Sequence, residues 1–135
     1  STFKGNADSS IPEYSFHWTG RSKYLLLFEA PIDMLSFISM HKKNWQQHSY
    51  AAACSVSDRV LFQMLKDNPN ISEVFLCMDS DEPGQTAAKR ISDKLFTQGI
   101  NAKILVPEHK DWNEDLLALN QEESEVEEPC QVLQL

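Results

Sequence analysis

Long apolar runs are absent from this sequence, and their absence excludes a membrane protein. The longest runs, such as those at 24–28 and 50–54, have five residues, whereas a bilayer span needs roughly 20. No positively charged start leads into an apolar stretch, so the sequence shows no secretory signal. The chain begins at Ser1 and not at Met, and we expect it to be a fragment of a longer, cytoplasmic protein.

Cysteine and histidine are few and widely spaced. The three cysteines, Cys54, Cys77 and Cys130, form no CxxC motif and have no spacing typical of metal ligands. The four histidines form neither an HxH nor an HExxH pattern, so we expect no zinc site. Because Cys54 and Cys77 lie within apolar runs, they are typical of buried thiols in a reducing compartment.

Basic residues are in the minority, with 12 Lys and Arg against 20 Asp and Glu and a net charge of −8. This excess of acid at first argues against a nucleic-acid-binding protein. However, seven of the acids lie from Asn113 onward, where the sequence has no Lys or Arg. Residues 1–112 therefore hold 12 basic and 13 acidic side chains. The acidity belongs to the C-terminal segment, and its acid-rich run at 121–128 is typical of a solvated, disordered tail.

From residue 23 onward, short apolar runs alternate with segments of helical periodicity. Strands are predicted at 23–29, 49–54, 73–78 and 102–106, with a less regular edge strand or half of a hairpin at 14–18. Helices are predicted at 31–43, 58–68, 83–99 and 113–119. Strands too apolar for burial on one face, separated by helices, favour an α/β fold with a parallel sheet covered on both faces.

The length of the chain fits one domain with flanking segments. We expect an N-terminal extension or edge strand at 1–22, the α/β domain at 23–120 and an acidic, disordered tail at 121–135. In the helix at 31–43, the apolar residues Ile32, Leu35, Phe37 and Ile38 are the expected buried positions.

Carboxylates follow the ends of three predicted strands. Glu29 ends the first strand, Asp79 and Asp81 follow the third, and Asp111 comes after the fourth. Because the carboxyl ends of parallel strands meet at one edge of a sheet, we expect these side chains to converge there. Asp33, one helical turn after Glu29, points back towards the same edge. Glu82 lies beside the pair formed by Asp79 and Asp81.

Such a concentration of carboxylates predicts a cation site. At neutral pH the carboxylates would repel one another without a cation, and hard oxygen ligands suit Mg²⁺, for which Mn²⁺ can substitute. Asp81 alone has an equally good structural explanation, because acids after a strand often cap helices. Glu29 is harder to explain in that way, since it ends a five-residue apolar run.

Three segments resemble the signature blocks of the Toprim domain, which occurs in type IA and type II topoisomerases, bacterial primases, some nucleases and recombination proteins. The segments are FEAPIDMLSF at 28–37, VFLCMDSDEPGQTAAKRI at 74–91 and VPEHKDWNEDL at 106–116. The third is most similar to primase- or relaxase-like proteins of bacterial mobile elements. The resemblance covers residues 23–117 and implies a Rossmann-like fold with about four mainly parallel strands.

The resemblance also implies roles for single residues. Glu29 matches the family's glutamate, a general acid/base or metal-facing group, and Asp79 and Asp81 match the DxD pair that binds Mg²⁺. Asp33 matches the aspartate of the primase-type EGxxD sequence. Asp111 matches the first acid of the DPD-like block.

Four further residues lie in the segments that resemble the Toprim domain. Gly84 matches the glycine that follows the DxD pair. Ala30 replaces the usual glycine after the glutamate. Asn113 stands where primases place a second aspartate, which leaves one carboxylate fewer for a second metal. Trp112 has two interpretations, a platform for stacking a base or a plug between helix and sheet, and the second is favoured.

Basic residues of the main domain allow a polyphosphate partner. Without the six candidate acids, residues 1–112 hold 12 basic and seven acidic side chains. Lys110, Arg90 and Lys89 are candidates for contact with nucleic acid or phosphate, although surface lysines on helices are the simpler explanation.

The resemblance implies a Mg²⁺-dependent domain that acts on nucleic acid or nucleotides. Its expected setting is the catalytic domain of a primase-like nucleotidyltransferase, in a bacterial replication or mobilisation protein with further domains. A topoisomerase would need a nucleophilic tyrosine from another domain, because Tyr14, Tyr24 and Tyr50 show no sign of that role. Two alternatives stay open: a non-catalytic module that binds metal and nucleic acid, and a Toprim-type nuclease.

Overall fold

Five strands form one sheet in the computed structural model, which describes residues 16–53 and 57–134, the last ten of these by backbone alone. The strands are β1 (His17–Trp18), β2 (Tyr24–Phe28), β3 (Ser49–Ala52), β4 (Glu73–Cys77) and β5 (Asn101–Ile104). Their order is β1-β3-β2-β4-β5. Strand β1 pairs with β3 in the antiparallel sense, and the other neighbours are parallel. The mainly parallel α/β fold and its extra edge strand are confirmed, and Tyr14 and Ser15 lie outside the described residues.

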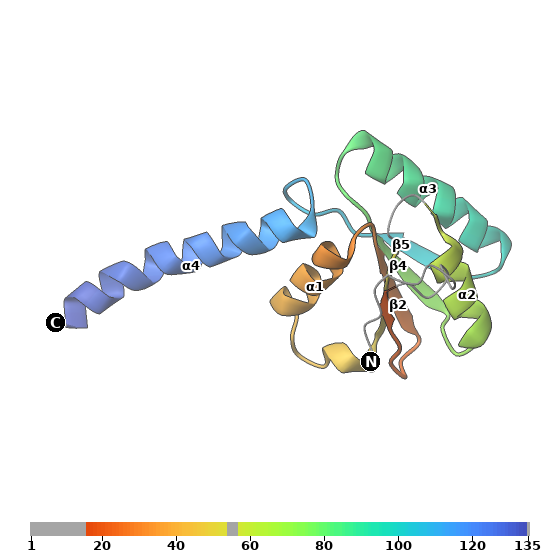
Figure 1. Cartoon of the computed structure of the whole chain (residues 1–135), viewed down its shortest axis with the longest axis horizontal. Helices are drawn as coiled ribbons and strands as arrows, with labels where there is room; N and C mark the ends of the chain where they lie inside the picture. Colours follow the sequence, from red (N-terminus) through yellow and green to blue (C-terminus); the bar gives the residue numbers. More distant parts are fainter. Residues whose placement is uncertain (1–15, 54–56, 135) are drawn as a thin grey trace.

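Helices cover both faces of the sheet (Figure 1). They are α1 (Pro31–Met40), α2 (Arg59–Asp67), α3 (Glu82–Thr97) and α4 (Trp112–Gln134), with a short 3₁₀ helix η2 (Trp45–Gln47) before β3. Helices α2 and α3 lie on one face, and α1 and the start of α4 lie on the other. Among the described helices, none is long and apolar enough to cross a bilayer.

Two apolar layers explain why the central strands β2 and β4 are almost continuously hydrophobic. Along β2, Leu25 and Leu27 pack towards α2 and α3, whereas Leu26 and Phe28 pack towards α1 and α4. Successive side chains of a strand point to opposite faces, so burial on both faces requires a continuous apolar run. Cys77 at the end of β4 is also buried, as expected, whereas Cys54 and the side chain of Cys130 lie outside the described residues.

Helix α1 buries a different face from the one that its apolar residues predict. Ile32 and Leu35 are 55% and 40% exposed, whereas Asp33, Met34 and Ser36 are buried. The prediction that Ile32 and Leu35 are core residues is therefore wrong. Helix α1 turns its polar side towards α4, where polar side chains find hydrogen-bonding partners.

Helix α4 extends much further than the segment 113–119 that the sequence predicts as a helix. It continues to Gln134, through the acidic run that was expected to be disordered. Residues 116–123 are good helix formers, mainly Leu, Ala, Gln and Glu. The acidic side chains Glu114 and Asp115 in the first turn favour the helix start. The side chains of 119–124 are all exposed, so this part of α4 has no packing partner among the described residues. The division into three segments stays a prediction.

Candidate metal centre

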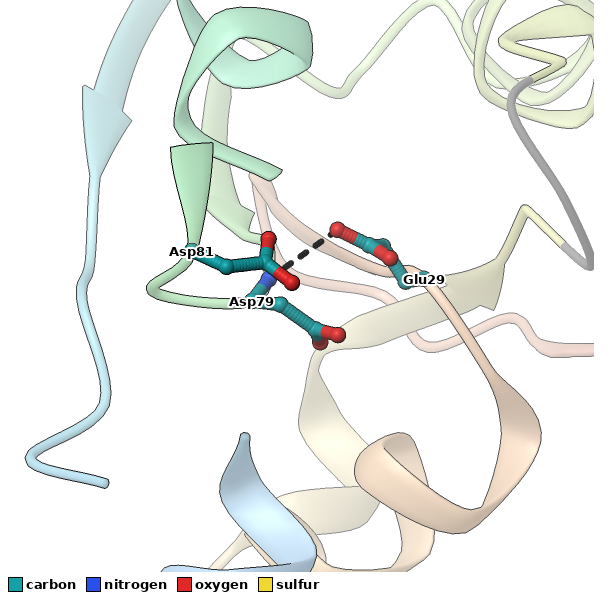
Figure 2. Close-up of side chains that lie close together, drawn as sticks. All are labelled: Glu29, Asp79 and Asp81. Carbon is teal, nitrogen blue, oxygen red and sulfur yellow. Dashed lines mark hydrogen bonds between the residues drawn. The ribbon is translucent and has the colours of Figure 1, made fainter. Parts of the chain in front are cut away.

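Carboxylates from four parts of the chain meet at the carboxyl edge of the sheet. Glu29 follows β2, Asp33 lies in the first turn of α1, Asp79 and Asp81 follow β4, and Asp111 precedes α4. The central strands β2 and β4 are parallel neighbours, with Phe28 opposite Cys77. Glu29 and Asp79 are therefore brought side by side, and Figure 2 shows them together with Asp81. We call these five residues the acidic cluster.

Two groups of three carboxylates lie within the acidic cluster. The first consists of Glu29, Asp79 and Asp81, and the second of Asp33, Asp79 and Asp111. In each group, one oxygen from every side chain lies within 4.8 Å of the others. Asp79 belongs to both groups, so it is the centre of the acidic cluster.

Hydrogen bonds leave one oxygen of this centre without a partner. The backbone N–H of Asp79 donates to Glu29 Oε1 at 3.2 Å, as Figure 2 shows. By contrast, Asp79 Oδ1 is buried and accepts no hydrogen bond from any described residue. Buried polar atoms are nearly always paired. An unpaired carboxylate oxygen among other carboxylates is therefore a position that a cation would satisfy.

Burial and mutual repulsion raise two pKa values in the acidic cluster. The pKa of Asp79 rises from 3.8 to about 7, first through burial and then through the charges of Glu29, Asp33, Asp111 and Asp81. Burial also raises the pKa of Asp33, opposed by the hydrogen bond from the backbone N–H of Asn113. In the metal-free protein, Asp79 is therefore partly protonated near neutral pH.

Two members of the acidic cluster also cap helices. Asp81 Oδ1 accepts a hydrogen bond from the N–H of Gly84 at 2.9 Å at the start of α3. Asp111 Oδ1 accepts one from the N–H of Glu114 at 2.8 Å at the start of α4. The capping explanation for Asp81 is therefore correct, and it is compatible with membership in the acidic cluster because each carboxylate has a second oxygen.

Position 84 requires a glycine because atoms of Asp79 and Glu29 lie too close to leave room for a side chain. A Cβ atom at this position would lie 2.3 Å from the carbonyl oxygen of Asp79 and 2.8 Å from Glu29 Oε1. Any side chain would therefore push against both the β4–α3 turn and the glutamate. Ala30, in contrast, has an extended backbone with φ −137°, which every residue adopts, so the missing glycine there has no conformational cost.

Asn113 and Trp112 hold the start of α4 against the rest of the domain. Asn113 donates its backbone N–H to Asp33 Oδ1 at 3.2 Å, and its side-chain oxygen accepts from Ser36 Oγ at 3.2 Å. Trp112 is 8% exposed, donates to the carbonyl oxygen of Cys77 at 3.0 Å and lies edge-on to Phe37. The plug interpretation of Trp112 is confirmed.

The remaining predicted site residues lie around the acidic cluster or away from it. Glu82 is exposed and belongs to neither group. Arg90 forms an ion pair with Asp58 at 3.3 Å, and Lys89 is exposed on α3. Burial raises the pKa of Asp33, and the charge of Lys110 opposes that rise, so Lys110 acts electrostatically on the acidic cluster.

Ser80 is a connecting residue that the sequence did not reveal. Its hydroxyl donates to the carbonyl oxygen of His109 at 2.7 Å, and its backbone N–H donates to that of Lys110 at 2.8 Å. These bonds join the turn that carries Asp79 and Asp81 to the loop that carries Asp111. A serine between two acids gives no signal of such a contact, because its partners lie about 30 residues away.

Comparison with known proteins identifies the family. A family model described as Toprim-like matches residues 26–116, which is more than half of the chain. The chain belongs to the Toprim-like family. No curated protein sequence matches it.

Solved structures share the fold of this Toprim-like domain. The primase fragment of the bacteriophage T7 primase-helicase protein superposes with a TM-score of 0.56 at 22% identity, over 82% of this chain and 44% of that one. The same TM-score, identity and coverage of this chain hold for a structure of the T7 lagging-strand DNA polymerase interacting with primase domains bound to an RNA/DNA hybrid and dTTP, with 54% of that chain covered. The Toprim-like chain thus spans about half of these chains.

The Toprim-like site fits a divalent cation. Toprim domains generally bind divalent metal, and the two carboxylate groups meet that need with hard oxygen donors. The buried, unpaired oxygen of Asp79 lies where the two groups overlap.

Proposed function

We propose that this domain binds Mg²⁺ at the acidic cluster and acts on nucleic acid or nucleotides by primase-like nucleotidyl or phosphodiester transfer. Its setting would be a larger replication or mobilisation protein of the bacterial cytoplasm. The observation that carries the proposal is the buried Asp79 Oδ1, unpaired among the described residues and shared by two carboxylate groups. Mn²⁺ is expected to substitute, because it accepts the same oxygen ligands.

The acidic cluster divides naturally into two roles. Asp79 would hold the cation with Asp81 from the first carboxylate group and with Asp33 and Asp111 from the second, and Glu29 would face it. Bound Mg²⁺ would neutralise the charge of substrate phosphates. Glu29 is fixed through one oxygen by the N–H of Asp79. Its other oxygen can take the proton of an attacking hydroxyl as the new P–O bond forms and the leaving group departs. We therefore assign Glu29 as the general base.

Neighbouring residues would keep these groups in place. Gly84 leaves room for Glu29 beside the β4–α3 turn, and Asn113 positions Asp33 through its backbone N–H. Lys110, which acts electrostatically on the same edge, is our candidate for contact with a phosphate. Glu82, Lys89 and Arg90 are less favoured, because Glu82 lies outside both carboxylate groups and Arg90 is paired with Asp58.

A non-catalytic module that binds metal and nucleic acid is the second candidate. One observation favours it: the side-chain oxygen of Asn113 is already bonded to Ser36. An amide adds no negative charge at this position, so the acidic cluster has one carboxylate fewer than the primase pattern that the sequence resembles. Such a domain would bind Mg²⁺ and nucleic acid without forming or breaking phosphodiester bonds.

Calorimetric titration of Mg²⁺ and Mn²⁺ tests the proposed site. We expect binding by the wild type and none by Asp79→Asn/Asp81→Asn, in which Asn can still cap α3. Asp93→Asn/Glu123→Gln is the matched control, since it removes two exposed acids outside the acidic cluster and should bind like the wild type. Equal, very weak binding by all three proteins would refute the site.

Activity assays then separate the candidates. Primer extension or DNA nicking that needs Mg²⁺ or Mn²⁺ and is lost in Glu29→Gln would support catalysis, with nicking alone indicating a nuclease. Metal binding without any turnover of nucleotides or DNA would indicate the non-catalytic module.

A further inference from the structure

A groove lies on the face of the sheet that carries α1, away from the acidic cluster. It has a volume of about 430 Å³ and is lined by the starts of β2 and β4, by β5 and by the segment that follows α1. Tyr24 and Glu73, the first residues of β2 and β4, mark its position near the amino ends of the strands. Helix α1 begins at the opposite end of the strands, and its Phe37 lies on one wall of the groove.

Aromatic rings dominate the walls of this groove. Tyr24 and Phe75 come from adjacent strands, with ring centroids 5.7 Å apart, and Trp45 lies 6.1 Å from Tyr50. Tyr24, Phe75 and Trp45 are each partly exposed, so their rings are accessible from the groove. Partly exposed aromatic rings stack with the bases of nucleic acid whatever their sequence. The volume of this groove falls in the usual range for small-molecule sites. We call it the aromatic groove.

The charges around the aromatic groove favour an anion. Lys43 and Lys103 line it with exposed side chains. Glu73, the one acid among the described lining residues, is neutralised by Lys23 at 3.5 Å and accepts a hydrogen bond from Asn101. This region is therefore basic although the whole chain carries a net charge of −8. A planar ring that carries a phosphate matches both features.

We propose that the aromatic groove binds a nucleotide unit of single-stranded nucleic acid, with its base on the rings of Tyr24, Phe75 and Trp45 and its phosphates beside Lys43 and Lys103. A free mononucleotide offers the same chemistry, and the experiment below separates the two sources. This site needs no metal, and its location at the amino ends of the strands is distinct from the acidic cluster. It therefore goes beyond the proposed function and does not depend on it.

Fluorescence anisotropy of a labelled oligothymidine strand, titrated in EDTA at several salt concentrations, tests the aromatic groove. For Lys43→Ala/Lys103→Ala we expect weaker binding and a salt slope reduced by about 1.4, or about 0.7 for each lost phosphate contact. For Phe75→Leu, which stays apolar but loses the ring, we expect a loss of affinity of about 10-fold. Lys66→Ala/Lys94→Ala is the charge-matched control, with one exposed lysine on α2 and one on α3, and should leave affinity and slope near the wild type.

The outcomes distinguish the binding sites. Displacement of the strand by dTMP would show that the groove also accepts a free nucleotide, whereas failure of dTMP to compete would show that it needs a strand. Unchanged affinity and slope in both groove variants would overturn the proposal. Loss confined to Lys66→Ala/Lys94→Ala would also overturn it and would place the strand on the face of α2 and α3. Because EDTA is present throughout, failure here says nothing against Mg²⁺ binding at the acidic cluster.

Discussion

Replacement of Asp79 by Asn should stabilise the metal-free protein at alkaline pH. Burial and four neighbouring carboxylates raise the pKa of Asp79 from 3.8 to about 7. An acid whose pKa is higher in the folded protein than in the unfolded chain loses stability when it ionises. The free energy of unfolding of the wild type should therefore fall as the pH rises from about 4 to about 7, and stay low above that range.

The magnitude follows from the shift in pKa. A rise from 3.8 to about 7 corresponds to at most about 4 kcal/mol, at about 1.4 kcal/mol for each pH unit. The side chain is partly exposed, and screening by solvent reduces this upper limit to about 1–2 kcal/mol. Asp79→Asn removes the charge and keeps the size of the side chain, so it should recover that amount at pH 8. For a domain of this size, we expect a rise in Tm of roughly 4–8 °C.

Thermal unfolding of the wild type, Asp79→Asn and Asp93→Asn provides the assay. In EDTA at pH 8 Asp79→Asn should unfold at the highest temperature, whereas the exposed Asp93→Asn should match the wild type. At about pH 4 the advantage of Asp79→Asn should be largely lost, because the wild-type carboxyl is then protonated in the folded protein. Excess Mg²⁺ should raise the Tm of the wild type and of Asp93→Asn but not that of Asp79→Asn, since a ligand stabilises only the state that binds it.

An Asp79→Asn protein that is no more stable than the wild type at pH 8 in EDTA would refute this reasoning. It would mean that repulsion among the carboxylates of the acidic cluster does not measurably lower the stability of the folded protein. The same conclusion would follow if Asp93→Asn gave an equal gain, because the effect would then come from net charge and not from the acidic cluster.

Four further substitutions have defined outcomes. Gly84→Ala should lower stability by about 1–3 kcal/mol and weaken Mg²⁺ binding in calorimetry, because its Cβ would meet Asp79. Gly99→Ala is the control, because Gly99 has φ +76° and open space around it. It should lower the free energy of unfolding by about 1 kcal/mol and leave Mg²⁺ affinity unchanged. Equal Mg²⁺ affinity in the two glycine variants would contradict the steric explanation. Ser80→Ala should reduce Mg²⁺ affinity with a loss in urea-unfolding free energy of only about 1 kcal/mol, and an unchanged affinity would show that the link between the two loops is not needed. Trp112→Phe keeps an aromatic ring but loses one buried hydrogen bond, so denaturant unfolding should show a loss of about 1–3 kcal/mol, and no loss would contradict the plug role.

The sequence carried enough information to predict the sheet and the edge at which the carboxylates meet. Burial on both faces requires continuous apolar strands, as in β2 and β4, and this requirement is visible in the order of the residues. Parallel strands all end at the same edge, so the position of Glu29 after one strand and Asp79 after another predicts their proximity. The three segments that resemble the Toprim domain contain the same residues.

Helix rotation and helix length could not be predicted in the same way. The apolar residues Ile32 and Leu35 suggested one buried face for α1, but its contacts with the start of α4 select another, on which Asp33 and Ser36 are buried. Periodicity records which residues are apolar, whereas the packing partner decides which face is covered. Likewise, the charge of the C-terminal run suggested disorder, although its composition also favours a helix.

By itself, the sequence determined the α/β class, the parallel strands and the group of acids that end them, because burial and chain direction act through local patterns. Only the tertiary structure decided that Asp79 is shared by two carboxylate groups, that Asn113 turns to Ser36, and that aromatic rings from separate strands form a groove. These features depend on strand register and helix packing over distances of a few ångströms. Residues far apart in the chain set them jointly, and no local pattern of residues records them.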